Sequence, residues 1–218
     1  MPSQEPVGPA APQHPRFARV YARAVVGMNR RGGTEHRRRL LSGLQGSVIE
    51  VGAGEGSSFR LYPSTVTDVL AVEPDDYLRG LAEERAASVS VPVVVVAGSA
   101  EHLPAPNAGA DAVVCSLVLC SVPDQGRALA EMYRVLRPGG TLAFYEHVRS
   151  HRQWIAAVED AVTPGWQRLA GGCHLNRDTL RAITDAGFQV QDNERFGFAP
   201  QPLTPAAAHI LGHATRPD

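Results

Sequence analysis

A glycine-rich stretch that begins with an acid is the first part of the sequence able to do chemistry. Residues 50–56 read E-V-G-A-G-E-G and follow a short apolar run. Glycines in this place let backbone approach a ligand and open the next helix. A dinucleotide loop would read G-x-G-x-x-G, but the sixth position counted from Gly52 is Ser57. The loop therefore favours a ligand without a pyrophosphate, with a ligand-free tight turn as the alternative.

A second acid lies where a ribose-binding carboxylate is expected. Glu73 ends the next apolar run, 21 residues after Gly52, and a carboxylate there accepts hydrogen bonds from both ribose hydroxyls. Glu50, before the glycines, can meet an ammonium group directly or through water. A ribose and an ammonium without a pyrophosphate fit S-adenosylmethionine (SAM), which we predict as the cofactor.

A third apolar run ends at the same edge of the predicted sheet. It is followed by "GSAE" at residues 98–101, at the edge where an adenine would lie, since open α/β sheets bind ligands beyond the carboxyl ends of their strands. From these runs we predict cofactor contacts by Glu50, Gly52, Ala53, Gly54, Gly56, Glu73, Pro74, Ser99, Ala100 and Glu101.

The elements that position these residues alternate between strand and helix. From residue 46, short apolar runs and helical patterns take turns, which predicts an α/β fold with a mainly parallel sheet. Helical patterns at 17–26 and 36–44 precede them, after a start with five prolines in residues 1–15 that predicts a disordered tail. Beyond 150 we expect a helical region interrupted by Pro164 and Gly165. A helix with Asn176 as its N-cap and two closing strands should follow.

Composition narrows the class of protein. The 218 residues suit one domain, and 44% hydrophobic content with a net charge of −1 gives no reason to expect nucleic acid or an anionic membrane as main partner. The apolar runs are shorter than the ~20 residues of a membrane span, and no signal peptide is recognisable. We therefore predict a cytoplasmic protein. Every basic residue is arginine, which we interpret as the bias of a GC-rich bacterial genome.

The three cysteines are too few for a disulfide framework, and two of them lie in one stretch. Cys115 and Cys120 are separated by four residues, as in some zinc pairs, but a zinc site needs further Cys or His ligands at regular spacing, and the only other cysteine is Cys173. A redox pair would more often read C-x-x-C. A composite site with Cys173 and His174 is the alternative. We predict no metal.

The order of these motifs resembles the class I SAM-dependent methyltransferases, for which "RVLRPGG" at 134–140 is specific. "VCSLVLCSV", "EHV", "GGCHLNRDTL" and "HILGHA" also look like the mammalian alkyl-thiol methyltransferases of the methyltransferase-like 7 group, over about residues 45–215. The resemblance implies a Rossmann-like fold with a seven-stranded, mostly parallel sheet and helices on both faces. It also implies residues 16–45 as helices that cover the cofactor, and 46–218 as the methyltransferase domain with an acceptor-pocket insert at about 150–176.

The resemblance also assigns residues. It implies that Ser116, Leu117 and Val118 contact the cofactor, that Cys120 borders the acceptor, and that Tyr21 touches the methionine end. Two departures are visible. The mammalian proteins begin with a hydrophobic membrane anchor where this chain has its proline-rich start, and many members of the superfamily carry Asp in place of Ser99.

The acceptor decides which further groups the chemistry needs. A thiol, with a pKa of about 8.5, is already partly thiolate at neutral pH, whereas an aliphatic hydroxyl would need a base or a metal. Glu146 and His147 end the last parallel run and are our candidates for a base or a polar acceptor contact. The alternative is that one of them caps a helix or fixes a loop.

The C-terminal part supplies the candidate acceptor pocket. Trp166 and Phe198 could wall an apolar pocket or belong to the core, and the resemblance places Cys173 and His174 beside the acceptor. We predict S-methylation of a small hydrophobic thiol or dithiol, xenobiotic or from a natural product. The alternatives are O- or C-methylation of a lipid, quinone or carboxylate, and a non-catalytic SAM-binding regulatory protein. A monomer and a homodimer both stay open.

Overall fold

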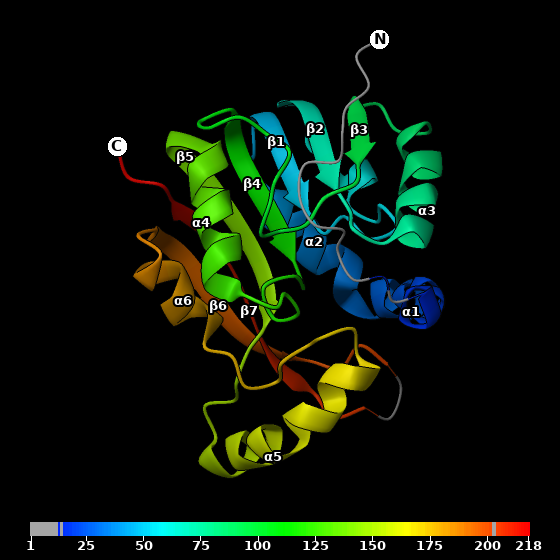
Figure 1. Ribbon diagram of the computed structural model, residues 1–218, viewed down its shortest axis with the longest axis vertical. Coiled ribbons are helices and arrows are strands. Elements are labelled where there is room, and N and C mark those ends of the chain that lie inside the picture. The colour runs from blue at the N-terminus through cyan, green and yellow to red at the C-terminus, as the bar shows by residue number, and fades with distance from the viewer. Residues whose placement is uncertain (1–12, 14, 202–203) are drawn as a thin grey trace.

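The structure is a computed structural model that describes residues 13, 15–201 and 204–218. Most of the predicted tail, residues 1–12 and 14, lies outside the described residues. Seven strands form a single sheet in the order β3-β2-β1-β4-β5-β7-β6 (Figure 1). The strands are β1 (Gly46–Val51), β2 (Val66–Val72), β3 (Val93–Val96), β4 (Ala110–Ser116), β5 (Leu136–His147), β6 (Gln189–Phe198) and β7 (Ala207–Thr215).

The sheet confirms the predicted fold class. Strands β1 to β5 pair in parallel, and β7 pairs antiparallel with both β5 and β6. The order turns back at β1, with β2 on one side and β4 on the other, and this reversal opens a crevice at the carboxyl ends of the strands. The two closing strands expected after residue 187 are β6 and β7.

Helices lie on both faces of the sheet. They are α1 (Pro15–Met28), α2 (Thr34–Leu41), α3 (Asp76–Ala86), α4 (Gln125–Val135), α5 (Gln153–Leu169) and α6 (Thr179–Asp185), with a π-helical turn Asn29–Gly33 between α1 and α2 and a 3₁₀ turn Phe59–Leu61. Alternate residues of β4 show the two layers. Val113 and Cys115 pack with Met132 of α4, while Ala112 and Val114 pack with Leu40 of α2.

Two details of the C-terminal part differ from expectation. Asp178, not Asn176, caps α6, since its carboxylate accepts the N–H of Arg181 (3.2 Å), whereas Asn176 donates to Asp160 (3.0 Å). Helix α5 also continues through Pro164 instead of breaking there. Pro164 and the residue four before it, Asp160, are both exposed, so water can meet the carbonyl that loses its partner.

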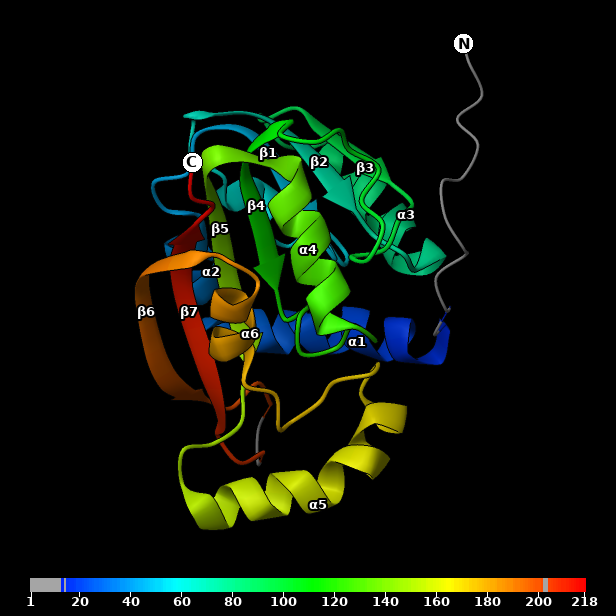
Figure 2. The ribbon, with the colours of Figure 1, turned by 60° about the vertical axis from the view of Figure 1, so that its left-hand side comes forward.

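Helix α5 lies apart from the layers of the sheet and its neighbours, beyond the carboxyl ends of the strands (Figures 1 and 2). It is followed by an irregular segment that runs back to the sheet before α6. None of the described helices is long and apolar enough to cross a membrane.

Candidate active site

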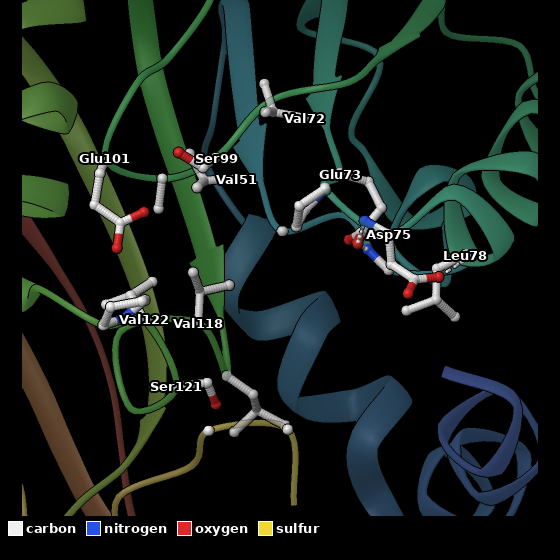
Figure 3. Close-up of a pocket in the computed structure, with 18 of the residues that line it drawn as sticks. Val51, Val72, Glu73, Asp75, Leu78, Ser99, Glu101, Val118, Ser121 and Val122 are labelled. Atoms are coloured by element: carbon white, nitrogen blue, oxygen red, sulfur yellow. Dashed lines mark hydrogen bonds between the residues drawn. The ribbon is translucent and has the colours of Figure 1, made fainter. Parts of the chain in front are cut away.

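A cleft of about 580 Å³ opens at the carboxyl ends of β1, β2 and β4, next to α1 (Figure 3). Twelve of the residues predicted from the sequence line it: Tyr21, Gly52, Gly54, Glu73, Pro74, Ser99, Ala100, Glu101, Ser116, Leu117, Val118 and His174. The lining is mostly apolar with a few polar groups, as is usual for a small-molecule site.

The glycine loop can follow its path only because its glycines lack side chains. Gly52 and Gly54 have φ of 66° and 58°, values that other residues rarely adopt. A Cβ on Gly52 would lie 2.6 Å from the side chain of Val118. The loop after β1 therefore fits closely against the loop after β4, and together they form the floor of the cleft.

Glu73 holds this loop and still faces the cleft. Its carboxylate accepts the N–H of Gly54 (2.7 Å) and the N–H of Asp75 (2.9 Å). Each oxygen of a carboxylate has two acceptor positions, so both keep capacity for a ligand hydroxyl. Burial raises the pKa of Glu73 to about 7, against the lowering effect of the two backbone hydrogen bonds.

Glu50, the acid before the glycines, is turned away from the cleft. It is buried and accepts a hydrogen bond from the Tyr62 hydroxyl (2.8 Å), and burial raises its pKa to about 7. Neither Glu50 nor Ala53 nor Gly56 lines the cleft. A Cβ on Gly56 would meet the Phe59 ring at 2.6 Å, which gives that glycine a packing role.

Helix α1 and the segment after α5 both reach the cleft, and they meet each other there. A Cβ on Gly54 would lie 3.5 Å from the Tyr21 ring, and one on Gly171 would lie 2.5 Å from Phe17. Tyr21 is therefore above the glycine loop, where burial raises its pKa to about 12. Figure 2 shows α1 crossing below the ends of the strands.

Glu146 is bound by the loop that follows β4. It is buried, and its carboxylate accepts the backbone N–H groups of Val118 (2.9 Å), Leu119 (3.0 Å) and Cys120 (3.1 Å). Burial raises its pKa to about 7, opposed by these bonds. Leu117, at the start of this loop, has a φ of 62°, which is strained for a non-glycine residue. Glu146 therefore holds a strained loop in place. Fixing a loop is the alternative to the predicted role of Glu146 as a base.

Of the residues predicted for the acceptor, only His174 lines the cleft, and Cys120, Cys173 and Trp166 lie beside it. Cys120 and Cys173 lie in thiol-to-thiol contact, and His147 and Trp166 also lie beside Cys173. The two segments run together, since the N–H of His174 donates to the carbonyl of Cys120 (2.7 Å). Contacts from Cys120, His147 and Trp166 lower the pKa of the Cys173 thiol.

His147 is 5% exposed, and neither of its ring nitrogens has a hydrogen-bond partner of good geometry among the described residues. Its ring lies 5.3 Å from that of His209, which in turn lies 5.7 Å from Phe198. Burial lowers the pKa of His209 to about 4, so this neighbour is neutral at physiological pH. Sequence analysis missed His209, whose only signal was its place in the "HILGHA" run.

Comparisons with known proteins agree with this geometry. Residues 49–144 match the family described as a methyltransferase domain. The chain is 34% identical to human thiol S-methyltransferase TMT1B over 81% of its length and 74% of the relative's, and 34% identical to human TMT1A over 83% and 78%. A solved SAM-dependent methyltransferase of Thermotoga maritima has the same fold, with a TM-score of 0.69 at 22% identity over 92% of this chain and 96% of that one.

The chain belongs to the class I SAM-dependent methyltransferases. The residues of the methyltransferase fit the cofactor that this membership implies. The hydroxyl of Ser116 and Nδ1 of His174 are buried at the cleft without a partner among the described residues, and Glu73 has acceptor capacity to spare.

Residues that the sequence pattern did not single out also line the cleft of the methyltransferase. At the end of the cleft beside Ser99, Nη2 of Arg127 lies 3.2 Å from Nε2 of His102, and the N–H of Asp124 donates to Glu101 (3.4 Å). Asp75 lines the cleft and also caps α3. Only the position of Asp75 after Glu73 and Pro74 could have indicated it.

Replacing Glu73 with alanine should weaken SAM binding by about 10- to 100-fold, because bonds between a charged group and the ribose hydroxyls, worth ~1.5–3 kcal/mol, are lost. Calorimetric titration with S-adenosylhomocysteine measures this. Glu73→Gln, which can still accept the Gly54 N–H, separates ligand contact from loop collapse, and Glu83→Ala on the exposed side of α3 is the control. Unchanged affinity in Glu73→Ala would exclude the ribose contact.

Proposed function

We propose that this methyltransferase transfers the methyl group of SAM to the sulfur of a small hydrophobic thiol. The observation that carries the proposal is the name of the two human relatives, thiol S-methyltransferases that are 34% identical over about four fifths of the chain. The site supports it because His147 is buried and has no hydrogen-bond partner of good geometry among the described residues. His147 also lies beside Cys173, whose neighbours favour a sulfur anion and lower the pKa of its thiol.

The residues of the cleft would hold the cofactor in place. Glu73 would accept the ribose hydroxyls, Tyr21 would cover the methionine end, and the loop of Leu117 and Val118 would border the methyl group. Bound SAM supplies an electrophilic methyl group. The main task of the protein is then to align the acceptor and to exclude water, for which the apolar lining and α1 are suited.

The acceptor would enter from the side of Ser121, Gly172 and His174, which line the cleft next to Cys120 and Cys173. The groups that lower the pKa of Cys173 would favour the thiolate of an incoming thiol in the same way, because a nearby hydrogen-bond donor stabilises a sulfur anion. His147 would take up the proton. Such a site gives little help to an aliphatic hydroxyl, whose pKa is far higher.

The test is a panel of acceptors with S-adenosylhomocysteine release as the readout. We expect small apolar thiols to be turned over with at least tenfold higher kcat/KM than matched phenols, quinols or fatty acids. Glu73→Ala serves as the control for cofactor dependence. Release only with oxygen or carbon acceptors would contradict the thiol proposal, and none with any acceptor, despite tight SAM binding, would favour the regulatory alternative.

The same panel tests the expected independence from metals. No cluster of three or more His, Cys, Asp or Glu side chains in the described part of the chain is placed to hold a metal ion. Turnover should therefore be the same in EDTA. Loss in EDTA that Mg²⁺ or Zn²⁺ restores would point to a hydroxyl acceptor.

A further inference from the structure

Among the described residues, helix α5 presents an exposed apolar stripe. Trp154, Val158, Val162, Trp166 and Leu169 are 69%, 53%, 46%, 44% and 79% exposed, and they make up five of the nine large exposed hydrophobic residues in the described chain. They are spaced by four and three residues, so they lie on one side of the helix. Single exposed apolar residues are ordinary, but a continuous row of this kind marks a binding surface.

Apart from Trp166, which is partly covered and lies beside Cys173, the stripe is not the side by which α5 packs on the protein. That side is formed by Ala156, Glu159 and Thr163, which are buried. Glu159 accepts the backbone N–H of Ser150 (2.8 Å), which ties the start of the helix to the chain before it. Helix α5 therefore packs on the protein through a separate inner face. The described residues leave the stripe exposed, so it is available to a binding partner.

The residue types and charges favour a lipid surface. A tryptophan lies near each end of the helix, and tryptophan prefers the boundary between headgroups and acyl chains. Arg152 and Arg168 flank the stripe, and no ion pair joins either to an acid in the described residues, whereas Arg149 is paired with Asp160 (2.8 Å). Arginines beside an apolar face attract anionic headgroups. The net charge of −1 for the whole chain does not show this local excess.

A second copy of the chain is less suitable as the occupant. The 17 residues of α5 span about 25 Å, and a stripe ~10 Å wide gives a footprint of about 250 Å². A stable dimer buries ~800 Å² on each partner. A bilayer has no such minimum, since an amphipathic helix binds it in proportion to the apolar area that it inserts.

We propose that α5 docks the methyltransferase on the surface of an anionic phospholipid bilayer, with its apolar stripe inserted and Arg152 and Arg168 at the headgroups. The last turn of α5 contains Gln167 and leads to Gly171 and Gly172, and all three residues line the cleft. Docking would therefore hold that side of the cleft near the layer into which apolar acceptors partition. This inference goes beyond the proposed function and does not depend on it.

The two tryptophans of the chain, Trp154 and Trp166, both lie on α5 and report on its surroundings without a label. The full chain is mixed with vesicles of phosphatidylcholine, with or without phosphatidylglycerol. With phosphatidylglycerol present we expect a blue shift of the tryptophan emission and co-sedimentation of the protein, both weakened by salt.

Variants distinguish vesicle binding through the stripe from nonspecific adsorption of the protein to vesicles. Val158→Ser/Val162→Ser keeps both tryptophans and the charge, and it should weaken vesicle binding by at least about tenfold. Val94→Ser removes a side chain that is 61% exposed on β3 and should bind like the wild type. Arg152→Gln/Arg168→Gln should lose the preference for anionic vesicles.

Three results would overturn the proposal. One is tryptophan emission that no vesicle shifts, and another is equal loss of binding in Val94→Ser and in the double serine variant. The third is a doubled mass by light scattering, with an emission shift that follows protein concentration without vesicles, which would assign α5 to a dimer interface.

Discussion

Replacing Glu146 with alanine should reduce kcat/KM by at least about 100-fold at every pH, although this carboxylate meets no reacting atom. Its three hydrogen bonds to the N–H groups of Val118, Leu119 and Cys120 fix the loop after β4. Buried donors that lose their acceptor cost ~1–3 kcal/mol each unless the loop moves to find water. Since Leu117 is held at a φ of 62°, we expect the loop to relax. A displacement of about 1 Å at the reacting centre can cost 100-fold in rate.

The size of the loss does not separate a positioning role from a catalytic base, so the measurement is a pH–rate profile. Glu146→Gln retains an oxygen for Val118 and Leu119 but turns its amide N–H group toward the N–H of Cys120. We expect it to lie between wild type and Glu146→Ala at all pH values, with a lower Tm and weaker SAM binding. Glu159→Ala is a matched control, a buried acid that accepts a single backbone N–H. Recovery of Glu146→Ala at high pH with unchanged SAM affinity would show that Glu146 is a base.

The fold was predictable because parallel strands and their helices leave a strong periodic signal. The strands β1 to β5 are apolar runs that end in glycines or acids, and their carboxyl ends must share one edge of the sheet. That argument placed Gly52, Gly54, Glu73 and Ser99 at one cleft, where the structure has them. It could not orient Glu50, because a residue near a strand end can face either side, and Tyr62 gives it a partner from a distant turn.

Sequence periodicity could not predict which way the side chains at the end of β5 point, for a physical reason. Residues 142–147 are all buried, so both faces of the strand are covered and alternation carries no information. Glu146 and His147 necessarily point to opposite faces. Only the structure shows that Glu146 faces the loop after β4 and that His147 faces the segment of Cys173.

The acceptor side depended on contacts between distant parts of the chain. Cys120, His147 and Cys173 come from a loop, a strand end and the segment after α5, and no spacing rule brings them together. The helix start at Asp178 is a smaller case of the same kind. Asn176 and Asp178 can both cap a helix, and the choice falls on Asp178 because Asn176 is used by Asp160 of α5.

Replacing His147 with alanine should lower kcat/KM for a small apolar thiol by about 10- to 100-fold at pH 7. General-base assistance is typically worth ~10²–10⁴-fold, and a thiol should show the low end because its thiolate also forms unaided. With a pKa near 8.5, about 3% of a free thiol is ionised at pH 7 and about three quarters at pH 9. The variant should therefore recover most of the loss by pH 9, which an aliphatic alcohol could not do.

The neighbours of His147 supply the controls for this experiment. His209→Gln alters the adjoining ring, 5.3 Å away, and tests whether loss of packing alone lowers the rate. Cys173→Ser removes the thiol beside His147 and tests whether that sulfur, instead of the acceptor, is its proton partner. We expect both variants to keep the pH profile of the wild type, because neither removes the group that accepts the proton. A His147→Ala variant equally inactive at pH 7 and pH 9, with normal SAM binding, would contradict the mechanism, since solvent ionisation of the thiol would then give no rescue.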